Sequence, residues 1–304
     1  MLRYRFIFYV FSGTLIVVSV AALVWFGLPL GSEFLGGSLL EADFGDEAVT
    51  ADSLARGLSD FGFHDVAIAA TGENGFVLRM NAIDEPTHSR LSDALRRIQS
   101  SYAERRFTTI GPALGRELFT RMLWGMAFAF LGIFVYLAAA FRRSGFRRAG
   151  SGAPPASLYG LVGVGILAHD VFITAGVMTL LAQGYGLEFG ASFIAALLAV
   201  AGYSINDTII IFDRVREQLR SGSADDRGGA IAAAVRASAR RSAFTSFTTL
   251  LALAAVFLFG GTGLMVFSLT LIVGIIIGTY SSLAIAGSLV YDLGPRRALA
   301  RQAG

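Results

Sequence analysis

The stretch GYSINDTIIIFDR, residues 202–214, decides the fold because it places a carboxylate inside an apolar run. The run extends over residues 189–212, and Asn206 and Asp207 lie well within it. On insertion scales, a carboxylate near the bilayer interior costs at least about 2.5–3.5 kcal/mol. The Asp207 side chain must therefore face other helices, water or a partner rather than lipid.

The composition is typical of a protein that is built in a membrane. Of the 304 residues, 54% are hydrophobic and 15% are charged, whereas soluble domains are less apolar and more charged. A bilayer core about 30 Å thick needs roughly 20 apolar residues of helix to cross it. Six segments meet that requirement: 7–28, 121–141, 158–181, 189–212, 243–260 and 264–290. The fifth is the weakest, because FTSFTT opens it with hydroxyls.

The first segment could be a cleaved signal peptide, because MLRYR is a basic start. Its apolar region is long for a signal, however, and no small-x-small cleavage site follows before GLPLGSEF. We therefore expect an uncleaved first membrane helix within residues 1–28. The absence of cysteine excludes a disulfide framework and a thiolate metal site.

Arginine placement predicts how the spans are oriented, because cytoplasmic loops carry an excess of basic residues. Arginines cluster before span one, between spans two and three, between spans four and five, and after span six. With six spans, these four segments all lie on one side of the membrane. The two turns on the other side, AQGYGLE and FGGTG, contain no arginine. Both termini are therefore expected in the cytoplasm, in a multi-pass protein of the inner membrane.

Residues 29–120 are then expected outside, as a small α+β domain between spans one and two, ahead of a five-helix bundle at 121–304. GGSLLEADF and ERRFTTIG read as strands, and DVAIAAT and FVLRMNA flank the turn sequence TGENG as a hairpin. TADSLARGLSDFG and EPTHSRLSDALRRIQSSY read as helices. The order strand, helix, strand, strand, helix, strand predicts a ferredoxin-like sandwich. An irregular loop would not show this alternation.

Polar residues on three predicted helices form a candidate proton path: Asn206 and Asp207, His169 and Asp170, and Arg241. At 1.5 Å per residue, Asp207 would lie about 8 Å above the cytoplasmic end, with Asp170 about 10 Å deeper. A carboxylate that alternates between a dry pocket and a wet, arginine-facing one can take up and release a proton. The alternative is a static pair of Asp207 with Arg241, and His169 alone could be a satisfied interhelical hydrogen bond.

Five stretches carry a family resemblance. GYSINDTIIIFDRVRE closely resembles the fourth-helix signature of the SecF family, whose members form the smaller subunit of the SecDF complex of the bacterial Sec translocase. The others agree in order and spacing: GLPLGSEFLGGSLLE, IGPALGREL, AHDVFIT and RRSAFTSFTTLL. Glu33 stands where the family usually has Asp, and Leu35 where Thr is common. These departures affect the extracytoplasmic entry segment and leave the proton path intact.

The resemblance implies one half of an RND-type transporter, with SecD as the other half. Such a pair assists the export of unfolded preproteins through the SecYEG channel, and proton flow moves its extracytoplasmic domains. By position, Asp207 is implied to be the proton carrier and Arg241 its charge partner. His169 and Asp170 match a second polar motif of less certain role. No enzymatic activity, cofactor or nucleic-acid partner is expected.

Two other classes of function remain open. A proton-coupled exporter of small molecules shares the architecture, although the outer domain here is single and small. A structural assembly factor would explain the fold but would leave Asp207 buried without a purpose. A nucleotide-driven motor is excluded, because a chain without lysine has no glycine-rich loop followed by Lys. No nucleophile–base arrangement supports a hydrolase.

Gly274 and Gly278 form a small-xxx-small pattern on the sixth span. Such a pattern lets the backbone of another helix approach closely. We expect a helix-packing face there, the alternative being an idle pair in a chain with 36 glycines.

The predicted topology can be tested by labelling single cysteines, because the chain has none of its own. An impermeant thiol reagent should reach a cysteine placed at Ser100 in intact cells, but not one placed at Ser223. Labelling of the Ser223 position alone would overturn the arrangement of the six spans.

Overall fold

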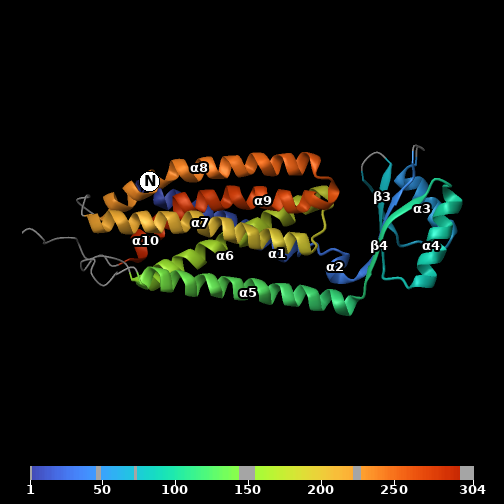
Figure 1. Ribbon diagram of the computed structural model, residues 1–304, viewed down its shortest axis with the longest axis horizontal. Coiled ribbons are helices and arrows are strands. Elements are labelled where there is room, and N and C mark those ends of the chain that lie inside the picture. Colours follow the sequence, from blue (N-terminus) through green and yellow to red (C-terminus); the bar gives the residue numbers. More distant parts are fainter. Residues whose placement is uncertain (1, 46–48, 72–73, 144–154, 222–226, 295–304) are drawn as a thin grey trace, which may run out of the picture.

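The computed structural model describes residues 2–45, 49–71, 74–143, 155–221 and 227–294. Within these ranges, six helices are long and apolar enough to cross a membrane, so the predicted class of fold is confirmed. They lie side by side as a bundle, and an α+β domain extends beyond one end (Figure 1). Ser223 and the arginines beyond residue 294 lie outside the described residues.

The spans begin and end as follows: α1 (Arg5–Phe26), α5 (Pro112–Arg143), α6 (Ala156–Tyr185), α7 (Ala191–Ser221), α8 (Arg227–Phe259), and α9 (Thr262–Ser281) continued by η3 (Ser282–Ala286) and α10 (Gly287–Leu293). A 3-10 turn, η1 (Leu2–Tyr4), precedes α1.

Two helices are longer than their apolar segments. α5 begins at Pro112 rather than at residue 121, and α8 begins at Arg227 rather than at residue 243. Proline suits the first turn of a helix, and the early part of α8 is rich in alanine and arginine, which are strong helix formers. Apolar length therefore predicts the membrane-embedded part of a helix and not its full extent.

The threonine hydroxyls that weaken the fifth span are satisfied within their own helix. Thr245, Thr248 and Thr249 donate to the carbonyl oxygens of Arg241, Phe244 and Thr245 at 3.0, 3.1 and 2.9 Å. Because every polar group in the hydrocarbon region needs an internal partner, these bonds make α8 compatible with a membrane.

The outer domain has the predicted ferredoxin-like topology. Its elements are β1 (Gly37–Asp43), α3 (Ala51–Asp60), β2 (Ala67–Thr71), β3 (Gly75–Met80), α4 (Glu85–Ile98) and β4 (Ala103–Ile110). The strands pair antiparallel in the order β2-β3-β1-β4. Leucines from β1, β3, α3 and α4 form its core: Leu40, Leu54, Leu58, Leu78, Leu91 and Leu95. A short helix that the sequence did not predict, α2 (Ser32–Leu35), leads into β1.

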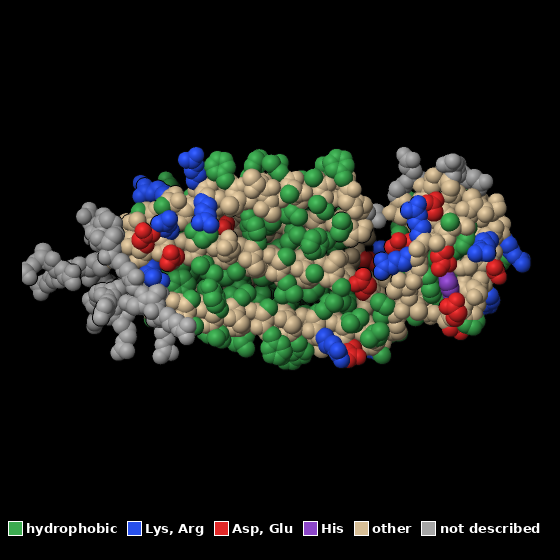
Figure 2. All heavy atoms as spheres, viewed as in Figure 1, with side chains coloured by type: hydrophobic (Ala, Val, Ile, Leu, Met, Phe, Trp, Pro, Cys, Tyr) green, Lys and Arg blue, Asp and Glu red, His purple; other side chains and the backbone are tan. Residues whose placement is uncertain are grey.

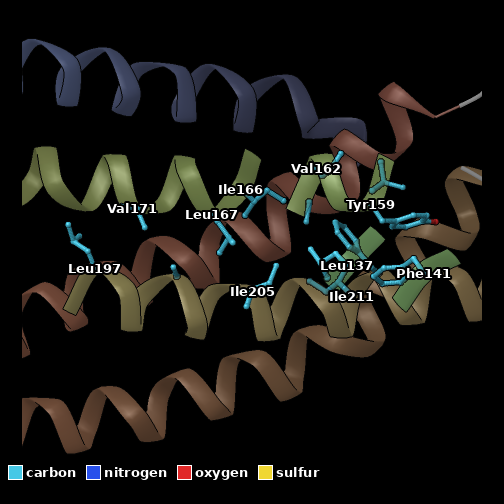
Figure 3. Packing of buried hydrophobic residues seen from close by; sticks show 14 of the residues in the cluster. Leu137, Phe141, Tyr159, Val162, Ile166, Leu167, Val171, Leu197, Ile205 and Ile211 are labelled. Carbon is cyan, nitrogen blue, oxygen red and sulfur yellow. The ribbon is translucent and has the colours of Figure 1, made fainter. Parts of the chain in front are cut away.

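The bundle core lies between α5, α6 and α7, where aromatic rings from the three helices meet (Figure 3). Phe141 stacks on Tyr159 with centroids 5.0 Å apart, and Tyr159 meets Phe212 edge-on at 5.1 Å. Charged side chains gather near the ends of the bundle and on the outer domain, whereas its middle is largely apolar (Figure 2). This distribution matches a slab of hydrocarbon around the middle of the bundle.

The small residues of the sixth span face α7. A Cβ atom at Gly274 would overlap the side chain of Val200, and one at Gly278 would lie 3.1 Å from Cβ of Ser204. The close approach of α7 and α9 therefore depends on these two glycines.

Replacing Gly274 with leucine should destabilise the bundle by about 1–3 kcal/mol, because overpacking a tight contact forces the helices apart. Gly132→Leu is the matched control, since a Cβ at Gly132 has open space around it. Thermal unfolding in detergent measures both variants. Equal stability of the two would contradict a packing role for Gly274.

Candidate functional site

A carboxylate with no exposed surface, that of Asp170, lies at the centre of the bundle. Its Oδ2 accepts hydrogen bonds from the hydroxyl of Ser204 on α7 and, at 2.8 Å, from that of Ser281 on α9. Its Oδ1 lies 2.8 Å from Nδ1 of His169. Asp170 thus joins three helices, and its two oxygens both have partners.

The other ring nitrogen of His169 extends this set of contacts to α1. Nε2 lies 3.0 Å from the Ser12 hydroxyl, which lies 3.4 Å from the Tyr280 hydroxyl. Tyr280 in turn donates to the carbonyl oxygen of Phe8 at 3.0 Å. We call these residues the Asp170 network: Ser12, His169, Asp170, Ser204, Tyr280 and Ser281.

A change of helix type adjoins the Asp170 network. The five residues that follow Ser281, in η3, form a π-helical turn. Such turns inside α-helices occur often at functional sites, because the wider turn redirects the side chains around it. Nothing in the sequence predicted it.

Asp207 has the opposite environment. It is 3% exposed, but its Oδ2 is buried and has no hydrogen-bond partner among the described residues. The same holds for the buried hydroxyls of its neighbour Thr208 and of Ser242, which faces it from α8. Other hydroxyls of α8, such as those of Ser238 and Thr245, donate to carbonyl oxygens of their own helix. We call Asp207, Thr208 and Ser242 the Asp207 cluster.

The two groups are closer along the bundle than the sequence suggested. Ser204, which binds Asp170, precedes Asp207 by three residues, a rise of about 4.5 Å, whereas the expected separation was about 10 Å. The expectation treated the helices as parallel, but α6 crosses the bundle obliquely (Figure 1). Thr208 lies one turn beyond Ser204 on the same face of α7, and it directly follows Asp207 in the sequence.

Arg241 and Asn206 do not contact Asp207. Arg241 is exposed, and in the described part of the chain no ion pair within 4.0 Å joins it to Asp207. Instead it lines a cavity of about 370 Å³ between α5, α7 and α8, together with Tyr136, Asp213 and Arg214. Asn206 is exposed and points away from the bundle. We call this space, on the arginine-bearing side of Asp207, the basic cavity.

A second line of hydroxyls crosses the bundle one turn away from the Asp207 cluster. Tyr203 donates to Ser246 at 3.3 Å, and Ser246 lies 2.6 Å from the hydroxyl of Thr279. These contacts hold α7, α8 and α9 together beside Asp207. No group of three or more His, Asp or Glu side chains suited to a metal ion occurs among the described residues.

The chain matches known proteins over nearly its whole length. Residues 90–296 match the family described as "Protein export membrane protein SecD/SecF, C-terminal". A protein translocase subunit SecF from Thermobaculum terrenum is 32% identical over 302 residues, covering 95% of this chain and 92% of the relative. The chain belongs to the SecF branch of the SecD/SecF family.

Two solved structures share its fold. The crystal structure of SecDF from Thermus thermophilus, described as a translocon-associated membrane protein, matches with a TM-score of 0.80 at 26% identity. SecDF in a "super-membrane-facing form" matches with a TM-score of 0.64, also at 26% identity. Each match covers 96% of this chain, which spans 38% of the length of either solved chain. Membership of the SecF branch implies a role in protein export in the membrane.

The residues that sequence reasoning missed in this SecF-type chain are Ser12, Tyr280 and Ser281 of the Asp170 network. Ser12, Tyr280 and Ser281 lie on helices distant in sequence from His169. Their only signal is that they are polar residues within apolar runs, and serine is common in such runs.

Replacing Asp170 with alanine should strongly destabilise the bundle. The change leaves the Ser204 hydroxyl and one ring nitrogen of His169 without their partner, and each buried unsatisfied group costs about 1–3 kcal/mol. The Ser281 hydroxyl keeps a second acceptor, the carbonyl oxygen of Gly278 at 3.1 Å. Ser288→Ala is a control, since the Ser288 hydroxyl donates to its own helix, to the carbonyl oxygen of Ala284 at 2.9 Å. Thermal unfolding in detergent compares them, and a loss no larger than that of the control would count against the network.

Proposed function

We propose that this chain couples proton movement through the membrane to protein export, with Asp207 as the proton carrier. It acts as the SecF-type half of a complex with SecD, beside the SecYEG channel, on unfolded preproteins. Both termini lie in the cytoplasm, and the chain itself catalyses no reaction. The description of the related SecDF as translocon-associated supports these partners.

The observation that carries the proposal is the unpaired carboxylate of Asp207. Buried polar atoms in native proteins are almost always hydrogen-bonded, and a group without a partner costs free energy. Here Oδ2 of Asp207 and the hydroxyls of Thr208 and Ser242 make no hydrogen bond of ordinary geometry among the described residues, although Ser242 lies close enough to interact with the carboxylate. A group that must change its protonation state benefits from an environment that satisfies neither state fully, since neither is then locked in.

The surroundings of Asp207 supply the two sides that a proton path needs. The basic cavity extends between α5, α7 and α8 on one side, with Arg241 at its wall. The residue after Arg241 is Ser242, which faces Asp207. Asp170 and His169 lie on the other side, where Asp170 accepts a hydrogen bond from Ser204, which precedes Asp207 by about one turn of α7. In our proposal these groups relay protons or respond to the charge of Asp207.

Movement of the outer domain is the second half of the proposal. The two SecDF structures match the same share of this chain at the same identity, yet their TM-scores are 0.80 and 0.64. Sequence divergence is equal in the two comparisons, so the difference in score reflects a difference in shape. This supports the proposal that proteins of this fold change conformation during their function.

The absence of a contact between Asp207 and Arg241 argues against a static ion pair. A pair that pinned α7 to α8 would hold the guanidinium against the carboxylate, but Arg241 is exposed and lines the basic cavity. Arg241 therefore does not hold the Asp207 carboxylate in a fixed ion pair. A proton carrier needs this freedom, because a permanent pair would keep the carboxylate charged.

Asp207→Asn keeps the shape of the side chain but removes its ability to carry a charge. We expect the variant to fold and to assemble with SecD, and to lose the stimulation of export by a proton gradient. Export into inverted vesicles, with and without an uncoupler, measures this, and a parallel series with a sodium gradient identifies the coupling ion. Glu217→Gln is the matched control, since this acid lies on the same helix with its side chain 56% exposed and does not line the basic cavity.

A static pair gives different results. Neutralising Asp207 would then leave an unpaired arginine, at a loss of about 3–5 kcal/mol for a buried pair, and replacing Arg241 as well would rescue stability. Full gradient-dependent export by a well-folded Asp207→Asn protein would end the proposal.

A further inference from the structure

The outer domain contacts the bundle at the short segment of residues 188–191, which joins α6 to α7. The amide of Gly31 donates to the carbonyl oxygen of Phe189 at 3.0 Å, and the amide of Phe189 donates to that of Pro29 at 2.7 Å. Nη1 of Arg79, on β3, lies 3.3 Å from Oε1 of Glu188. The joined helices carry Asp170 and Asp207.

Glu33 of α2 makes a further contact with this segment. Its Oε2 accepts a hydrogen bond of 2.6 Å from the backbone amide of Ala191, the first residue of α7. The first amides of a helix have no partner within the helix, and they attract negative charge. The Glu33 carboxylate therefore binds the end of the helix that carries Asp207.

The chain leaves room for this carboxylate. A Cβ atom at Gly190 would lie 2.8 Å from the carboxyl carbon of Glu33, so a larger residue would expel it. The next residue, Phe34, is 1% exposed and packs edge-on against Phe119 of α5 at 5.2 Å. A Cβ at Gly115 of α5 would lie 2.6 Å from the carbonyl oxygen of Phe34. α2 is thus held between α5 and α7.

The segment after α2 transmits its position to the sheet. Gly36 and Gly37 have φ angles of +84° and +149°, which residues with a Cβ rarely adopt. They lead directly into β1, which lies between β3 and β4. Glu33, α2 and these two glycines therefore form a continuous connection from the start of α7 to a central strand of the outer domain.

We propose that Glu33 is the positioning residue that couples α7 to the outer domain. The inference rests on the proposed function, since it takes proton binding at Asp207 as the event that displaces α7. Glu33 itself carries no proton across the membrane. It holds the helix end so that a shift of α7 becomes a movement of β1.

The experiment separates proton flow from domain movement. The chain is reconstituted with SecD in liposomes, with fluorophores on cysteines at Ser100 in the outer domain and at Gly184 at the end of α6. A pH-sensitive dye inside the liposomes reports proton entry, and energy transfer between the fluorophores reports domain movement when a proton gradient is imposed. The wild type should show both signals, and Asp207→Asn should lose both.

Glu33→Ala should keep the Asp207-dependent proton entry and lose the change in energy transfer. Glu33→Gln should retain part of that change, because its amide oxygen can still accept the bond from Ala191. Glu117→Ala is the matched control and should behave as the wild type, since Glu117 is an exposed acid near the start of α5 that pairs with Arg121.

Ala191→Pro provides an independent variant that does not alter Glu33. It removes the amide hydrogen that Glu33 binds, at a helix position where proline is well tolerated. It should reproduce the loss of domain movement with proton entry intact, even if Glu33→Ala does not fold.

The outcomes that contradict the proposals are distinct. An unchanged energy-transfer response in both Glu33→Ala and Ala191→Pro would overturn the role of Glu33 alone. Loss of proton entry in these folded variants would also overturn it, because Glu33 would then act on the proton path itself. Persistent proton entry in Asp207→Asn would overturn the proposed function, and the inference with it.

Discussion

A carboxylate inside a membrane bundle must find hydrogen-bond donors, and the rest of this structure depends on how Asp170 finds them. Its two oxygens engage His169, Ser204 and Ser281, which brings α6, α7 and α9 to one point. Because the Asp170 side chain has no exposed surface, its hydrogen-bond donors have to come from the protein itself. The spacing of the helices follows from this requirement, and Gly278 permits it by leaving its Cβ position empty beside Ser204.

The contrast between the two buried carboxylates separates structure from function. Both oxygens of Asp170 have hydrogen-bond partners. These hydrogen bonds favour the one arrangement of helices in which all of them can form. Asp207 lies about one turn beyond Ser204 on α7. Its Oδ2 has no hydrogen-bond partner among the described residues. This difference between the two acids is the reason that we propose Asp207, and not Asp170, as the group whose protonation changes.

Much of the fold followed from the sequence, because apolar length and strand–helix order depend on local residues. The burial of the Asp207 side chain was also predictable, since an acid within an apolar run must avoid lipid. The rest required tertiary structure: that Asn206 points outward, that Arg241 lines a cavity rather than pairing with Asp207, and that Ser12 reaches His169. Which face a residue presents depends on how the helices cross, and α6 crosses obliquely.

The π-helical turn η3 fixes how the last part of the sixth span is rotated. A π turn accommodates one residue more than an α turn, so α10 is rotated by about 100° from where a continuous α-helix would carry it. In that orientation Asp292 of α10 accepts a hydrogen bond of 2.9 Å from Tyr9 and lies 3.1 Å from Nε of Arg5. Straightening η3 would turn Asp292 away from α1. The contacts of Asp292 with Tyr9 and Arg5 therefore depend on the irregular turn.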